Sequence, residues 1–196
     1  MRVAHVLPHG WAFSGWSVDD VLSRYHFSKH FAALMARLGH EVRLFLLHED
    51  IRQTLKSHTD TAEIEVLPID ARMPLVRFGG DFSLSLLASL RSFRPELIHY
   101  HQYRSVMFPL IERLRAAPLV AQYHGGRMRA AELRLFGPFL RRTDSFVVSQ
   151  EAARRELVRR AGVASSRIFS VPLPLRGESR VRRLRDPPSG AVRLLC

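Results

Sequence analysis

Five polar side chains stand at the ends of short apolar runs, and their types could bind or activate a polar ligand. The runs are Val3–Leu7, Leu97–Ile98, Leu119–Ala121 and Phe146–Val148, and the side chains are His9, His99, His101, His124 and Ser149. An imidazole can donate, accept or carry a proton near neutral pH, and a hydroxyl can donate or accept a hydrogen bond. A fold that brings the ends of these runs together would make a polar ligand site.

The arrangement of the runs predicts such a fold. Short apolar runs that alternate with amphipathic segments are typical of strands buried on both faces of a parallel sheet. In these sheets, ligands bind outside the carboxyl ends of the strands. We therefore expect an α/β fold with one parallel sheet of about six or seven strands, helices on both faces, and all five side chains on one rim.

The remaining elements follow from local signals. Further strands are expected at 41–47, 64–67, 118–122, 145–148 and 168–171. A helix capped by Asp19 or Asp20 should run to about Leu38, where Gly39 ends it, and Asp81 should cap another. We expect a short helix at 51–57, a basic helical segment at 128–142 interrupted at Gly137-Pro138, and a helix at 150–161 ended by Gly162.

His99 and His101 could form a metal pair, because alternation along a strand sends both side chains to one side. No nearby acidic or cysteine residue completes a site, so we expect no metal. One of the two should pack inside the fold while the other reaches the cleft. Ser149 could cap the following helix, contact a ligand, or do both. It lacks the Gly-x-Ser-x-Gly context of a nucleophilic serine.

The net charge of +12 comes entirely from the second half of the chain. Residues 1–103 carry 11 basic and 11 acidic side chains, whereas residues 104–196 carry 19 and 7. Nearly all these cations are arginines, which suit bidentate contacts with phosphate. The charge favours an anionic partner, which could be a phosphorylated ligand, an acidic membrane surface or nucleic acid; the alternative is a merely solvated surface. Nucleic acid is disfavoured, because no known binding motif is present and the aromatic residues follow core spacing.

The basic segment 128–142 also contains apolar residues, which could complement a membrane surface or pack on the sheet. They are Met128, Leu133, Leu135, Phe136, Phe139 and Leu140. The N-terminus has no apolar signal-peptide core, and the single cysteine, Cys196, allows no disulfide within the chain. We therefore expect a cytoplasmic protein, peripheral on the membrane if the basic surface binds lipid.

Three segments are expected. Residues 1–171 should form the α/β domain, and residues 172–190 a linker rich in proline and arginine. Residues 191–196 look like the first strand of a second domain that is cut off.

Taken in order, several segments resemble the N-terminal domain of glycosyltransferase family 4, the retaining enzymes of GT-B fold. They are Arg2–Leu7, Ala32–Val42 with its Leu-Gly-His-Glu-Val ending, Pro95–His101, Pro118–Gly125, Asp144–Gln150, and Ala161–Val163 before Arg167-Ile168. The resemblance covers about residues 1–172 and rests on the whole series.

The resemblance implies a Rossmann-like domain that holds the acceptor and faces a second, donor-binding domain across a cleft. The enzyme would transfer a sugar from a nucleotide-sugar donor to a sugar or lipid-linked acceptor, without a metal or other cofactor. His124 matches the family's catalytic histidine. Residues expected to contact donor or acceptor are Gly10, Gly15, His99, His101, Gly125, Gly126, Arg127, Arg129 and Ser149.

The chain departs from the family pattern in three places. Leu22-Ser23 stands where the family has a Gly-Gly pair, and Pro172–Leu175 replaces the family's hinge phrase. The family's C-terminal domain, with its paired glutamates, has no counterpart expected within residues 1–196. The fragment should therefore be inactive by itself, and the competing interpretation is a non-catalytic, acceptor-binding protein.

Overall fold

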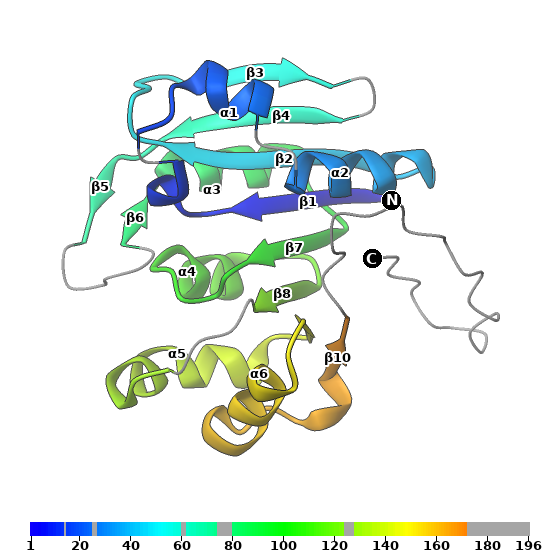
Figure 1. Cartoon of the computed structure of the whole chain (residues 1–196), viewed down its shortest axis with the longest axis vertical. Coiled ribbons are helices and arrows are strands. Elements are labelled where there is room, and N and C mark those ends of the chain that lie inside the picture. The colour runs from blue at the N-terminus through cyan, green and yellow to red at the C-terminus, as the bar shows by residue number, and fades with distance from the viewer. Residues whose placement is uncertain (14, 25–26, 60–61, 74–79, 124–127, 172–196) are drawn as a thin grey trace.

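One large sheet with helices on both faces forms the body of the protein. The computed structural model describes residues 1–13, 15–24, 27–59, 62–73, 80–123 and 128–171. The sheet has eight strands in the order β10-β9-β8-β7-β1-β2-β4-β3. Most of these strands can be followed from β3 at the top to β8 and β10 lower down in Figure 1.

Seven strands run parallel, which confirms the predicted α/β sheet. Their bounds are β1 Arg2–Leu7, β2 Glu41–His48, β4 Glu63–Pro68, β7 Leu97–His101, β8 Leu119–Tyr123, β9 Ser145–Val148 and β10 Ile168–Ser170. An edge strand, β3 (Leu55–His58), pairs with β4 in the antiparallel sense. A separate hairpin joins β5 (Ala71–Arg72) to β6 (Asp81–Phe82).

Alternation along the strands builds a core on each face. On β1, Ala4 and Val6 belong to the core that includes residues of α3 (Leu84–Phe93), α4 (Met107–Leu114), α5 (Ala130–Arg142) and α6 (Glu151–Glu156). Val3 packs with α2 (Phe27–Arg37), and Leu7 packs with α1 (Val18–Arg24). The side chain of His5 therefore faces α2, a placement that matters for the site below.

Short helical turns complete the chain. A 3₁₀ turn, η1 (Gly10–Phe13), follows β1, and another, η3 (Ser165–Arg167), precedes β10. A π-helical turn, η2 (Leu157–Ala161), continues α6 and ends at Gly162, which has a φ of 72°. Gly39 likewise has a φ of 86° after α2, as expected for glycines that end helices.

Two predictions about helix starts are wrong. The first helix is capped by Ser17, whose hydroxyl accepts from the Asp20 backbone N–H while the Asp20 carboxylate accepts from the backbone N–H of Ser17. Helix α3 is capped by Ser83, not Asp81, because the Ser83 hydroxyl accepts from the Leu86 N–H at 3.1 Å. Both segments offer several residues able to cap, and composition does not choose among them.

Two further element predictions need correction. The expected helix at 51–57 is absent, because β3 occupies Leu55–His58. The helix expected to run to about Leu38 is described as α1 and α2, and residues 25–26 between them lie outside the described residues. Pro138 lies inside α5 without interrupting it; Gly137, which has no Cβ, removes one of the clashes that a residue before proline usually suffers.

The expected linker at 172–190 and the strand at 191–196 lie outside the described residues.

Candidate functional site

The carboxyl ends of β1, β7, β8 and β9 lie next to one another, as predicted. Cross-strand partners Val6 with Tyr100, His101 with Gln122, and Tyr123 with Val148 bring the four ends to one edge. His9 follows β1, His101 ends β7, and Ser149 follows β9. This edge is called the rim below.

The segment that should supply most of the chemistry follows β8. His124, Gly125, Gly126 and Arg127 lie outside the described residues, so their predicted contacts stay predictions. Tyr123, which ends β8, is buried. The carboxyl end of β8 lies between those of β7 and β9, in the middle of the rim.

Ser149 does not cap the helix that follows it. The N-cap of α6 is Gln150, which makes no side-chain capping bond. The Ser149 side-chain oxygen is buried and has no hydrogen-bond partner within the described part of the chain. Of the two roles expected for this serine, the structure excludes the cap, and the contact with a ligand stays a prediction.

His99 and His101 project from one face of β7, as alternation predicted, with their ring centroids 4.6 Å apart. They are 6% and 5% exposed, and they lie against a third imidazole, His5 of β1, which is fully buried. The ring centroid of His5 lies 4.6 Å from that of His99 and 4.3 Å from that of His101. Burial, together with His99, holds the pKa of His5 well below its usual value. We call these three residues the histidine cluster.

Gly10 is held at the rim by a buried carboxylate that the sequence did not single out as a ligand. Asp81, 1% exposed, accepts a 2.8 Å hydrogen bond from the Gly10 backbone N–H and a 2.7 Å bond from Arg72. A Cβ at Gly10 would lie 2.3 Å from the Ile69 side chain, so the close approach favours glycine. Gly15 is exposed, with a φ of 79°, between η1 and α1.

A network of hydrogen bonds fixes the chain just after the segment 124–127. The backbone N–H of Met128 donates to Glu156 at 3.0 Å, and its carbonyl accepts from Arg160 at 2.7 Å. Arg160 also pairs with Glu156, so one ion pair holds both polar groups of the Met128 backbone.

Glu132 makes a second contact of this kind. Its carboxylate accepts from the backbone N–H of Arg129, at 2.7 Å, and pairs with Arg104. Burial alone would raise the pKa of Glu132, but these hydrogen bonds and the charge of Arg104 lower it overall. Arg129 itself is exposed at the start of α5, where a ligand at the rim could meet its guanidinium. We call Glu132, Glu156, Arg104 and Arg160 the α5 clamp.

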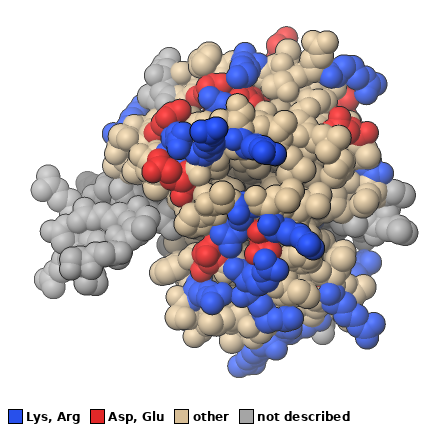
Figure 2. Space-filling model, turned by 180° about the vertical axis from the view of Figure 1, so that it is seen from behind, with Lys and Arg blue, Asp and Glu red and all other residues tan. Residues whose placement is uncertain are grey.

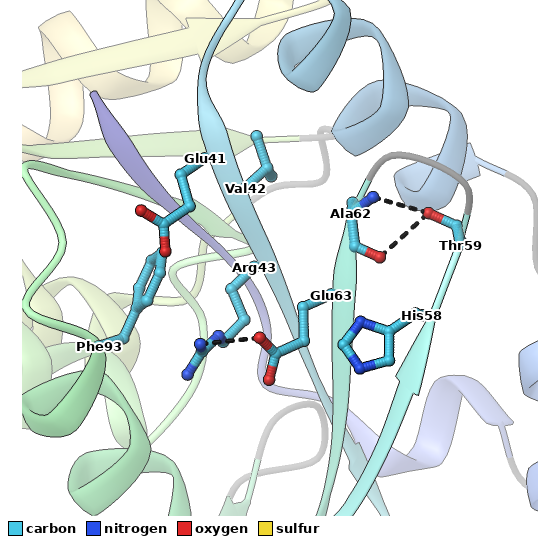
Figure 3. A pocket seen from close by; sticks show the side chains of 8 residues that line it. All are labelled: Glu41, Val42, Arg43, His58, Thr59, Ala62, Glu63 and Phe93. Carbon is cyan, nitrogen blue, oxygen red and sulfur yellow. Dashed lines mark hydrogen bonds and ion pairs between the residues drawn. The ribbon is translucent and has the colours of Figure 1, made fainter.

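A pocket lies at the opposite end of the strands. Figure 3 shows it between the amino ends of β2 and β4, with Phe93 of α3 on one side. Arg43 pairs with Glu63 at 2.8 Å and with Glu65 at 2.9 Å, and its guanidinium lies 4.5 Å from the centre of the Phe93 ring. These charges bind one another and hold β2 to β4, so we place the functional site at the rim instead.

Among the described residues, most of the excess positive charge lies in residues 128–171, which carry nine arginines and four acidic side chains and include α5, α6 and η2. Figure 2 shows blue side chains gathered over the lower half of the rear face, while the upper half mixes both charges. Exposed arginines in these elements and their flanks are Arg129, Arg134, Arg141, Arg142, Arg155, Arg159 and Arg167. Arg142 pairs with Glu112, at 3.4 Å.

The apolar residues of α5 pack on the sheet and do not complement this charge at the surface. Phe136 and Leu140, with Met128 just before the helix, are at most 1% exposed, and of the six apolar residues only Leu135 is largely exposed, at 53%. No helix within the described ranges is long and apolar enough to span a bilayer.

The fold and the rim define a class before any comparison: an α/β domain of Rossmann type whose ligand site lies at the carboxyl ends of its parallel strands. The family described as Glycosyltransferase Family 4 matches residues 27–175. The chain belongs to this family. A search of curated proteins gave no match.

Solved structures share the fold at low sequence identity. A part of sucrose-phosphate synthase from Thermosynechococcus elongatus has a TM-score of 0.59 at 12% identity, covering 90% of this chain and 91% of that one. The longer structure of that synthase has a TM-score of 0.56 at 13% identity. The match covers 88% of this chain and 48% of the synthase chain.

HepE of Anabaena, in complex with UDP and glucose, has a TM-score of 0.54 at 11% identity over 88% of this chain and 44% of its own. The chain thus spans less than half the length of the latter two structures. The shared fold is that of GT-B glycosyltransferases.

Proposed function

We propose that the chain is the acceptor-side domain of a retaining glycosyltransferase that takes a sugar from a nucleotide-sugar donor. The observation that carries the proposal is the rim. The chain belongs to glycosyltransferase family 4, and its rim is formed by the carboxyl ends of β1, β7, β8 and β9. His124 is the residue that follows β8 in the sequence. A domain of this shape can present an acceptor hydroxyl to a donor held opposite it.

Three groups at the rim would act on the sugars. The His124 imidazole would orient a hydroxyl or stabilise the charge that develops on oxygen during transfer. Gly125 and Gly126 would let the backbone approach the ligand closely. The Ser149 hydroxyl, which has no partner among the described residues, would complete a hydrogen bond to a sugar.

We propose further that transfer itself needs no metal, and that His99 and His101 support the rim from beneath without touching the sugars. Their burial supports this change from the ligand contacts predicted for them.

The charge distribution supports an anionic or lipid-linked acceptor. Arg129 is exposed immediately beyond the segment 124–127, and its backbone is fixed by Glu132. Arg127 would add a second guanidinium. A nucleotide-sugar donor is supported by the likeness to HepE, whose structure contains UDP and glucose.

The proposal is tested by following sugar transfer directly. The protein as its gene encodes it is incubated with UDP-, GDP- and ADP-sugars labelled in the sugar, together with an extract of bacterial lipids and sugar phosphates. We expect label in an anionic or lipid product with one of the donors. Release of label only as free sugar, or none from any donor, would contradict the proposal.

The same assay separates catalysis from simple acceptor binding. The chain covers 48% and 44% of two transferase structures, so we propose that residues 1–196 alone bind acceptor without turnover. Holding donor and acceptor in place supplies about 7–11 kcal/mol of catalysis in well-aligned cases, and one domain holds only one of them. Transfer by residues 1–196 alone would refute this division of labour.

A further inference from the structure

The histidine cluster is a candidate site of a different kind. His5 lies in the middle of β1, directly opposite His99 of β7, and His101 is two residues further along β7. All three imidazoles are buried beneath α2, where Phe31 stacks on His5 with a centroid distance of 4.9 Å and lies 5.1 Å from His99. Burying three imidazoles side by side costs free energy, which bonds to their ring nitrogens offset.

The ring nitrogens converge on a common point. One nitrogen from each ring can be chosen so that all lie within 4.8 Å of one another, and Nε2 of His5 is 2.6 Å from Nε2 of His101. Two ring nitrogens at that distance share a proton, whereas a bound cation would hold them farther apart. The other nitrogen of His5, Nδ1, is buried and has no hydrogen-bond partner among the residues that the structure describes.

The chemistry of the cluster suits a transition metal. Metal ligation uses the lone pair of a ring nitrogen, and each of the three rings offers one such nitrogen to the shared space. Nitrogen ligands favour zinc, copper, nickel or iron, while magnesium and calcium prefer oxygen. The sequence predicted no metal, since no acidic or cysteine residue completed the pair; the fold supplies a third histidine in their place.

We propose that His5, His99 and His101 bind one divalent transition cation, for which Zn²⁺ is the best fit. Tetrahedral zinc binds nitrogens at 2.0–2.1 Å, which places two such nitrogens about 3.3 Å from one another. The Nε2 atoms of His5 and His101, now 2.6 Å apart, would therefore have to separate. A pair of ligand nitrogens 4.8 Å apart would have to approach by about 1.5 Å. The fourth ligand would be water or another small group.

This site goes beyond the proposed function, because it lies beneath the rim and takes no part in sugar transfer. The cation would join β1 to β7, two of the strands whose ends build the rim. Since the unfolded chain does not hold the three histidines together, the cation would bind the folded state and stabilise it.

The first experiment uses the whole chain, freed of metal with a chelator. We expect Zn²⁺ to bind with a stoichiometry of one and, at 100-fold excess over its dissociation constant, to raise Tm by about 5–10 °C. Co²⁺ in place of zinc should give the intense visible absorption of a four-coordinate ion. X-ray absorption of the zinc-loaded protein should show nitrogen ligands at about 2.0–2.1 Å.

Variants assign the binding to the cluster. His5→Asn and His101→Asn should each lower zinc affinity at least about 100-fold, whereas His58→Asn, at an exposed position on β3, should bind as the unaltered chain does. Should a cluster variant fail to fold, the Co²⁺ and X-ray absorption spectra of the unaltered chain decide. No binding, a weak six-coordinate Co²⁺ spectrum, or unchanged affinity in both cluster variants would overturn the proposal and leave a shared proton between His5 and His101.

Discussion

The side chains near the rim differ in whether they make hydrogen bonds within the protein. Asp81 and Glu132 make bonds within the protein, and their loss should affect stability. The Ser149 hydroxyl makes none among the described residues. This difference allows a clear test at the scale of one residue.

Ser149→Ala should leave the free energy of unfolding within about 0.5 kcal/mol of the unaltered protein, because no internal hydrogen bond is lost. If the hydroxyl binds a sugar, transfer should fall about tenfold, the usual effect of one lost hydrogen bond. Denaturant unfolding and initial rates measure the two effects. Ser170→Ala, exposed on β10, is the matched control. A loss of stability above about 1.5 kcal/mol would show that Ser149 serves the fold.

Asp81→Ala should destabilise the protein by about 2–3 kcal/mol, since it leaves a buried backbone N–H at Gly10 without its acceptor and removes an ion pair with Arg72. Asp81→Asn, which keeps an acceptor oxygen, should cost less. Unfolding in urea measures both, with the exposed Asp50→Ala as control. Equal stability of Asp81→Ala and the unaltered chain would contradict the anchoring role.

At the scale of elements, the sequence predicted the parallel sheet well. Six of the seven parallel strands carry a buried apolar run, which can be recognised without knowing which strands lie beside it. The seventh, β10, buries only Ile168. Strand β3 was missed because Leu55–His58 is mostly exposed and lacks such a run. Antiparallel edge strands of this kind are stabilised by pairing with a neighbour more than by burial.

Contacts between elements distant in sequence could not be predicted. The histidine cluster requires β1 to lie beside β7, and the α5 clamp requires Glu156 of α6 to reach Met128. A histidine among the apolar residues of β1 was a signal that the sequence did offer. Its partners became clear only from the order of the strands.

The α5 clamp predicts a dependence of stability on acid. The pKa of Glu132 is lowered in the folded state, so its carboxylate stabilises the fold above the unfolded value, near 4.5, and this contribution is lost as the pH falls further. Glu132→Gln should therefore flatten the decline in unfolding free energy below about pH 4.5. Thermal or urea unfolding from pH 3 to 7 measures it.

Glu151→Gln, at an exposed position on α6, is the control for Glu132. An equally steep decline in Glu132→Gln and the unaltered protein would show that the clamp does not depend on this charge.

At the scale of the whole molecule, positive charge is distributed unevenly: residues 104–196 carry the entire net charge of +12. Since the apolar residues of α5 are mostly buried, any attraction to membranes should be electrostatic. We expect binding to vesicles containing anionic lipid, falling steeply between 50 and 300 mM salt, and none to neutral vesicles.

Sedimentation of the vesicles measures this binding. Arg134→Glu with Arg159→Glu should abolish it, whereas Arg52→Glu with Arg91→Glu, exposed changes in the electrically balanced half, should not. Equal binding to neutral and acidic vesicles would contradict an electrostatic surface.

The central claim, that sugar transfer takes place at the carboxyl rim of the sheet, is tested most directly by the rate of His124→Ala in the protein as its gene encodes it. The account predicts a fall in kcat/KM of at least about 100-fold with Tm unchanged, because a group acting on the reacting sugars is lost. His58→Ala, at the opposite end of the sheet, should keep the full rate. A normal rate in His124→Ala, or a matching loss in His58→Ala, would contradict the placement of the reaction at the rim.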